Sequence, residues 1–197
     1  MKAIMMSIKP QHVANILNGL KTIEVRKRFP KDYVGWVYIY VTSHKNYTQS
    51  LYEVETYKKK RKWDVDYYIP SEPGFILNGR VVARFWCDKV EEIKSCQVPF
   101  TFDQTIRDFY TDTFNDMDDL LKASCLDYYS LEQYLKRSKT GYAIHVAKLE
   151  IFYEPKEISE FKHIKLSLYF NEDSSGGWKE ELEPLTRAPQ SWCYIEV

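Results

Sequence analysis

The segment spanning residues 19–26, GLKTIEVR, gathers the side chains of this sequence that are best suited to chemistry. On a β-strand, its even-numbered residues share one face, whereas Ile23 and Val25 point to the other. A guanidinium offers a planar fork to phosphate groups or base edges, an ammonium offers a mobile charge, and a carboxylate accepts hydrogen bonds from amines. The pattern predicts a polar, ligand-binding face with Glu24, Arg26 and Arg28, and with Lys21 at the corner where the preceding helix meets the strand. The competing interpretation is an exposed strand with cross-strand salt bridges.

Charge is unevenly distributed along the 197 residues, although 28 Lys and Arg balance 28 Asp and Glu. Residues 1–62 contain 13 basic and 4 acidic residues, for a net charge of +9, so the remaining 135 residues carry −9. Such asymmetry favours a polyanion as partner, and interleaved tyrosines at 47, 52, 57, 67 and 68 suit single-stranded nucleic acid. Pairing of the two halves within the fold is the alternative. We predict backbone contacts from Lys58, Lys59, Lys60, Arg61 and Lys62.

Composition excludes several classes of protein. Aromatic residues make up 16% of the chain, which is too many for a disordered tail, and no apolar run is long enough to span a membrane. The N-terminus lacks the apolar segment and cleavage site of a secretory signal, so we expect a cytoplasmic protein. The four cysteines and four histidines are widely spaced, without C-x-x-C or H-E-x-x-H. We therefore expect reduced, mostly buried thiols, with no metal and no cofactor.

Elements that position the charged segment can be read from local patterns. Residues 3–8 predict a buried strand, and Pro10 suits the first turn of a helix over 10–18 that ends at Asn18-Gly19. Residues 22–27 alternate and predict a half-exposed strand, followed by a strong strand over 35–42. Residues 44–74 break the pattern and predict an inserted excursion.

The rest of the chain adds further strands and one helical region. We expect strands at 79–87 and 141–149, weaker strands at 162–169 and 191–196, an exposed loop at 171–177, and mostly helical structure over 100–138. No regular strand–helix–strand alternation is present. The prediction is an α+β fold with a small mixed or antiparallel β-barrel flanked by short helices.

The spacing G-x-K-x-x-E-x-R at residues 19–26 resembles the motif of ASCH domains of the PUA-like superfamily, in their short bacterial and phage form. The flanking elements are similar too, including residues 79–85 as a barrel strand and 134–146 as a closing helix and strand. The resemblance covers residues 1–43 and about 75–152. It implies one domain over 1–160 with an excursion at about 44–74, and an extension over 161–197 that packs on the same domain.

This resemblance implies a PUA-like barrel whose charged cleft binds RNA or a nucleotide. The ligand-binding residues would be Lys21, Glu24, Arg26, Arg28, Thr42, Ser43 and Tyr142. A first alternative is a nuclease or nucleoside amidohydrolase that uses Lys21 and Glu24 for acid–base catalysis. In the branch of the family that removes the acyl group from N4-acetylcytidine, a Thr occupies the position of Glu24. The expected nucleophile is therefore missing here, and Thr22 sits two residues away.

A second alternative is a protein-interaction module that uses the acidic segment 112–119. His145 lies on a strand, where it either points into the cleft or packs as a structural residue. No membrane contact is expected, and the sequence leaves any protein partner unknown.

Overall fold

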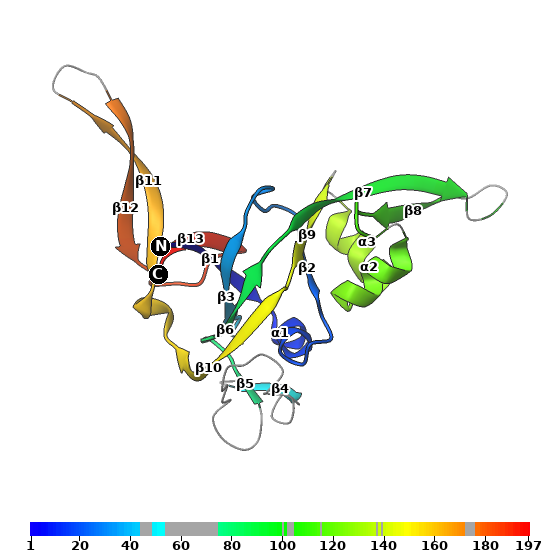
Figure 1. The fold of residues 1–197 in the computed structure, drawn as a ribbon, viewed down its shortest axis with the longest axis horizontal. Coiled ribbons are helices and arrows are strands. Elements are labelled where there is room, and N and C mark those ends of the chain that lie inside the picture. The colour runs from blue at the N-terminus through cyan, green and yellow to red at the C-terminus, as the bar shows by residue number, and fades with distance from the viewer. Residues whose placement is uncertain are drawn as a thin grey trace. The chain divides into compact units, whose positions relative to one another are not determined.

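A computed structural model of the chain describes residues 1–43, 49–53, 75–99, 101, 105–114, 116–136, 138, 140–171 and 176–197. These residues form an α+β fold in which strands predominate over short helices, which confirms the predicted class (Figure 1). They fall into two compact units that alternate along the chain: unit 1 comprises 1–14, 35–85 and 149–197, and unit 2 comprises 15–34 and 86–148. None of the helices in the described part combines the length and hydrophobicity needed to cross a membrane.

Unit 1 is built on a seven-stranded sheet with the order β10-β6-β3-β1-β13-β11-β12. The sheet is mixed, because β1 runs parallel to β3 and antiparallel to β13. The described strands lie in three sheets, and no single closed barrel is seen among them. The bounds of the seven strands are β1 Lys2–Ile8, β3 Gly35–Val41, β6 Val81–Cys87, β10 Lys148–Lys156, β11 Lys162–Phe170, β12 Gly176–Pro184 and β13 Trp192–Glu196.

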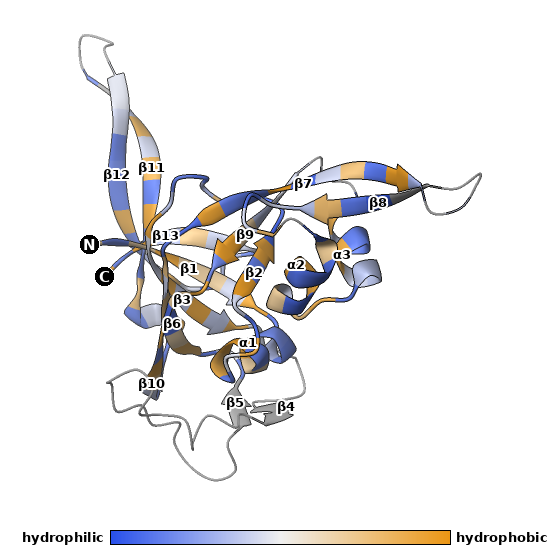
Figure 2. Cartoon of the chain, turned by 45° about the vertical axis from the view of Figure 1, so that its right-hand side comes forward, coloured by the Kyte–Doolittle hydropathy of each residue, from blue (hydrophilic) through white to orange (hydrophobic). Residues whose placement is uncertain are grey.

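The C-terminal segment is an integral part of this sheet. Strand β13 pairs with β1, with Met5 opposite Cys193, and β11 continues the sheet beyond it. Along β11, hydrophobic and hydrophilic residues alternate (Figure 2). Tyr38, Phe161 and Ile195 share one core cluster, so segments distant in the chain exclude water together. The predicted strands at 3–8, 35–42, 79–87, 162–169 and 191–196 are confirmed. The domain boundary proposed at residue 160 remains a prediction.

Unit 2 is a four-stranded sheet with the order β2-β9-β7-β8, and two helices pack on it. The core between them contains Val25 and Ala143 from the sheet and Leu120, Leu131 and Leu135 from the helices. Its elements are β2 Ile23–Arg26, β7 Val90–Pro99, β8 Thr105–Tyr110, β9 Gly141–His145, α2 Met117–Ser124 and α3 Tyr128–Leu135. The remaining elements of the chain are α1 Pro10–Leu17, β4 Gln49–Glu53, β5 Phe75–Leu77 and a short 3-10 helix over Ile158–Glu160.

Three expectations about element boundaries were wrong. The region 100–138 is not mostly helical, because pairing with β7 makes Thr105–Tyr110 strand β8. The strand expected over 141–149 is interrupted at residues 146–147, and its two halves, β9 and β10, belong to different sheets. The charged segment Gly176–Pro184 is a strand, although local composition predicted a loop at its start, because pairing with β11 overrides propensity.

Local signals fix the ends of α1 and α2, the two helices next to residues 19–26. Pro10 begins α1, and Gly19 follows it with a φ of 70°, as the Asn-Gly stop predicted. Asp116 caps α2 by accepting a hydrogen bond from the backbone of Asp119. At its other end, Cys125 adopts a left-handed conformation with a φ of 49°, so its backbone N–H can donate to carbonyls of the last turn.

The strain at Cys125 leads to a prediction about stability. A left-handed conformation costs an L-residue roughly 1–2 kcal/mol, while glycine loses roughly 0.5–1 kcal/mol through a freer unfolded chain. We expect Cys125→Gly to raise the free energy of unfolding by about 0.5–1 kcal/mol in urea titrations. Cys125→Ser keeps the strained backbone and serves as the control, which should show no gain. A glycine variant no more stable than the serine variant would contradict the prediction.

Candidate functional site

The backbone around residues 19–22 aims Lys21 at the end of α2. The N–H groups of Leu20 and Lys21 both donate to the carbonyl of Asn15, at 2.9 and 3.0 Å, which folds the chain tightly after α1. The N–H of Thr22 then donates to the carbonyl of Ala123 at 2.9 Å. These bonds tie the start of β2 to the C-terminal turn of α2.

Lys21 is almost completely buried, with 2% of its surface exposed. Its Nζ donates to the carbonyl oxygen of Ser124 at 2.5 Å and lies 3.4 Å from Oε2 of Glu24. Ser124 is the last residue of α2 and is itself buried. A helix leaves its final carbonyls without intrahelical partners, and its dipole places partial negative charge there. The ammonium therefore satisfies the end of α2 while the helix stabilises the ammonium.

Glu24 joins this ammonium to a second cation. Its Oε1 lies 3.0 Å from an Nη of Arg26, so one carboxylate contacts Lys21 on one side and Arg26 on the other. Glu24 is 5% exposed and Arg26 is 9% exposed. The three side chains carry a formal charge of +1, from two cations and one anion. We call them the motif cluster.

The strand predicted over 22–27 was expected to be half-exposed, but β2 is buried. All four residues of β2 are buried, including the two charged ones. Ile23 and Val25 contribute to the core of unit 2, as predicted, but the opposite face is also shielded from water. Charges are tolerated there because each has an opposite charge within contact distance. The alternative of an exposed strand carrying surface salt bridges is thus wrong for these residues.

Tyr142 extends the motif face onto the neighbouring strand. It lies directly opposite Arg26 in the β2–β9 pair and opposite Glu92 in the β7–β9 pair. Residues opposite one another share a face of the sheet, so Tyr142 and Arg26 lie on the same side. Lys31 lies 3.1 Å from Glu92 and has its Nζ 6.0 Å from the centre of the Tyr142 ring. The structure therefore brings this predicted site residue beside the motif.

Exposed cations follow the motif along the chain. The Nζ of Lys27 lies 5.0 Å from the centre of the Tyr134 ring, within the range of a cation–π contact. Arg28 is exposed, as is Lys31. We call the exposed side chains Lys27, Arg28 and Lys31 the basic strip.

The other predicted site residues belong to other segments of the chain. Thr42 and Ser43 follow β3 in unit 1, where the N–H of Thr42 donates to the carbonyl of Ile8, and their role as ligand contacts remains a prediction. The basic run Lys58–Lys62 lies outside the described residues. In the acidic segment, Asp112 pairs with Lys94 at 2.7 Å and Asp116 caps α2, so two of its carboxylates already serve the fold.

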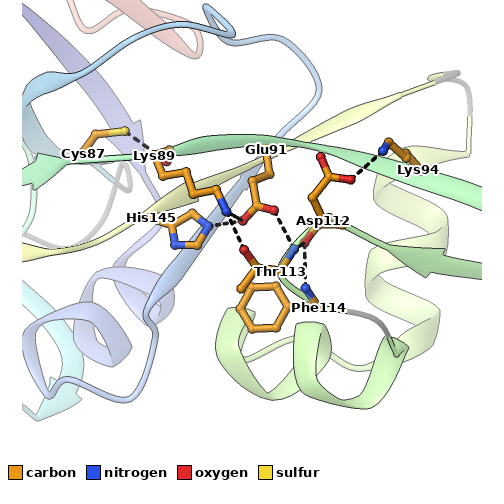
Figure 3. Close-up of polar contacts among 9 residues, drawn as sticks. Cys87, Lys89, Glu91, Lys94, Asp112, Thr113, Phe114 and His145 are labelled. Atoms are coloured by element: carbon orange, nitrogen blue, oxygen red, sulfur yellow. Dashed lines mark hydrogen bonds and ion pairs between the residues drawn. The ribbon is translucent and has the colours of Figure 1, made fainter.

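A second polar cluster on β7 was not recognised from the sequence. Figure 3 shows the carboxylate of Glu91 at its centre: Oε1 lies 2.5 Å from Nε2 of His145, and Oε2 accepts a hydrogen bond from the N–H of Thr113 at 2.8 Å. Lys89 contacts the same carboxylate at 3.3 Å and donates to the hydroxyl of Thr113 at 2.6 Å. The ring of Phe114 stacks on His145, with 6.2 Å between the ring centres. The cluster fastens the loop that leads into α2.

Electrostatics explain why Glu91 can be ionised although only 4% of it is exposed. Burial alone raises the pKa of this carboxyl, but hydrogen bonds from Thr113, His145 and Lys89 outweigh burial and lower the pKa to about 2. Sequence patterns gave no sign of this role, because Glu91 and Glu92 are adjacent and only the strand register decides which one faces inward. His145 is therefore a packed residue with a carboxylate partner.

The four cysteines differ in their burial. All four cysteines are free thiols, but only Cys87 is buried, so the expectation of mostly buried thiols was wrong. Burial raises the pKa of Cys87 to about 12 and that of Cys193 to about 11. Within the described residues no group of three or more His, Cys, Asp or Glu side chains is arranged to hold a metal ion.

Comparison with known proteins gave structural matches alone. No family model matches the chain, and no curated protein matches its sequence. The structural matches include ASCH from Zymomonas mobilis, with a TM-score of 0.45 and 12% identity over 79% of this chain and 73% of that one. Two mutant forms of that protein match with TM-scores of 0.44 at 13% and 12% identity, covering 80% and 79% of this chain and 77% and 73% of theirs. In each case the similarity is one of structure at low sequence identity.

Removal of the buried ammonium is expected to destabilise unit 2. Lys21→Met leaves the carbonyl of Ser124 without its donor and Glu24 without one of its two cations, so we expect a loss of roughly 3–5 kcal/mol in the free energy of unfolding. The matched control is Lys27→Met, an exposed cation in the same segment, which should cost less than about 1 kcal/mol. Equal losses in the two variants would contradict the role assigned to Lys21.

Glu91 predicts a specific acid sensitivity. Its pKa falls from 4.5 to about 2 on folding, so its contribution to stability is complete above pH 4.5 and disappears as the pH falls from there towards 2. The shift corresponds to on the order of 3 kcal/mol. In urea titrations between about pH 7 and about pH 3, Glu91→Gln should lose less stability than the wild type does. Parallel pH profiles for the two proteins would rule out this role for Glu91.

Proposed function

We propose that the chain is an ASCH-type, PUA-like domain that binds RNA or a nucleotide through the motif cluster and the basic strip of unit 2. The observation that carries this proposal is the convergence of Lys21, Glu24 and Arg26 within contact distance, with exposed cations directly after them in the chain. The PUA-like barrel architecture belongs to the same proposal.

Charge supports an anionic ligand. The motif cluster has one cation more than it has anions, and Lys27, Arg28 and Lys31 add three cations to the ten-residue stretch after Lys21. Glu24 holds Arg26 in place through an ion pair of 3.0 Å, so the guanidinium is oriented before a ligand arrives. Oriented cations bind phosphate groups with a smaller entropy cost than mobile ones do.

Aromatic rings support a ligand that carries bases. Tyr134 and Tyr142 each have a lysine of the basic strip near their rings, at 5.0 and 6.0 Å. Alternation of phosphate-binding cations and ring faces is typical of surfaces that bind single-stranded nucleic acid, because bases stack while the backbone is neutralised. Sequence-independent contacts of this kind suit RNA or a nucleotide better than a protein ligand.

Binding of a labelled single-stranded RNA should weaken steeply with salt. Each phosphate contact releases counterions and contributes about −0.7 to the slope of log affinity against log salt. We expect Arg28→Ala to lower the affinity and to make this slope shallower by about one contact, as followed by fluorescence anisotropy. Lys165→Ala removes the same charge from β11 in unit 1 and serves as the control. A salt-independent affinity, or equal effects of the two variants, would overturn the proposal.

Hydrolysis is the second candidate, and it is favoured by one contact. The ammonium of Lys21 and the carboxylate of Glu24 lie 3.4 Å apart, close enough for one substrate to contact both, as acid–base catalysis by this pair requires. Both groups are nearly inaccessible, so a substrate would have to displace one of their present partners. Chromatography of the RNA or of N4-acetylcytidine after incubation distinguishes the two functions. Product formed by the wild type and lost in Glu24→Gln indicates hydrolysis, whereas intact ligand indicates binding alone.

A further inference from the structure

Beyond His163, β11 and β12 form a hairpin that pairs with no third strand among the described residues. Strand β11 pairs with β13 at Lys162 and His163, whereas its pairing with β12 continues from Lys162 to Phe170. Among the described strands, residues 164–170 therefore have β12 as their one partner. A two-stranded hairpin is marginally stable in water by itself, so its side chains must gain contacts elsewhere.

The two faces of this hairpin differ in character. Opposed residues share a face, so Leu168 with Trp178 and Ile164 with Leu182 form one apolar face that also contains Leu166. The other face carries ion pairs, with Lys165 bonded to Glu183 at 3.1 Å and Lys179 to Glu181 at 2.8 Å. The alternating colours along β11 in Figure 2 follow from this division.

The large hydrophobic side chains of the apolar face are exposed. Trp178 is 69% exposed, Leu166 60%, Leu168 51% and Leu182 45%. These four side chains leave roughly 400 Å² of apolar surface in water, which is comparable to the largest patch of a typical monomer. Glu180 lies on the same face, and its charge is paired with Lys2 at 2.8 Å.

We propose that this apolar face is a self-association surface that packs on the same face of a second copy of the chain. A face of two antiparallel strands can meet itself about a two-fold axis. On the two strands, Lys162, Lys165 and Lys179 balance Glu180, Glu181 and Glu183, so the paired strands carry no excess charge into the contact. The residues that connect the strands add Glu172 and Asp173, so the whole segment 162–184 has a net charge of −2 with His163 counted as neutral. This net negative charge disfavours RNA and anionic lipid, which both require excess positive charge.

The available area suits a dimer of moderate affinity. When apolar atoms supply about 60% of an interface, roughly 400 Å² of apolar surface implies about 650 Å² per copy. Two copies then bury roughly 1,300 Å², which lies within the range of specific interfaces of about 1,200–2,000 Å². Pairing through the open edge of β12 is less favourable, since its residues 179–181 and 183 are charged and charged edges resist strand addition.

Light scattering coupled to size-exclusion chromatography tests the proposal on the full chain. The expected mass is near 23.5 kDa at about 1 µM and near twice that value at about 100 µM, as for a weak interface. Trp178→Lys and Leu168→Lys should both remain monomeric, because each copy brings an unpaired charge to the apolar contact.

Tyr169→Lys is the matched control, since it replaces an exposed aromatic residue on the opposite face of the same hairpin. It should dimerise as the wild type does. Circular dichroism checks that all variants are folded, which is expected because the replaced side chains are exposed. A wild type that stays monomeric up to about 100 µM overturns the proposal, as does a dimer that persists in both face variants or dissociates equally in the control.

Discussion

A buried ammonium is the constraint on which the structure of unit 2 depends. Lys21 is withdrawn from water and must find compensation inside the protein, and it finds it in the carbonyl of Ser124 and the carboxylate of Glu24. Lys21 and Ser124 are separated by 103 positions in the chain. The position of the helix end and the charge of the strand are therefore coupled, and neither is free to change alone.

Several local features serve this coupling. The tight turn after α1 directs Lys21 towards α2, the left-handed residue Cys125 ends the helix there, and the Glu91 cluster fastens the loop before its first turn. Each of these features contributes only modestly to stability by itself. Together they fix both ends of a helix of eight residues, which is too short to be stable without tertiary contacts. The charged face of β2 gains a fixed geometry as a result.

The two units differ in the charged, aromatic and apolar side chains that they carry. Unit 2 combines oriented buried charges with exposed cations and tyrosine rings, a combination that attracts phosphates and bases. The β11–β12 hairpin of unit 1 combines an electrically balanced face with an apolar one, which attracts another apolar surface. The proposed ligand binding and the proposed self-association therefore rest on separate groups of residues, and one group can be altered without changing the other.

Local sequence is enough to predict the α+β class, the strands with strong apolar or alternating patterns, the stop at Gly19 and the charged segment from Lys21 to Arg26, because these depend on neighbours in the chain. It does not predict that Glu24 and Arg26 are buried, that Glu91 faces inward, or that Thr105–Tyr110 and Gly176–Pro184 are strands. Those outcomes depend on partners supplied by distant segments. Strand pairing overrides local propensity, and a charged side chain is stable in the interior only where an opposite charge or a helix end meets it.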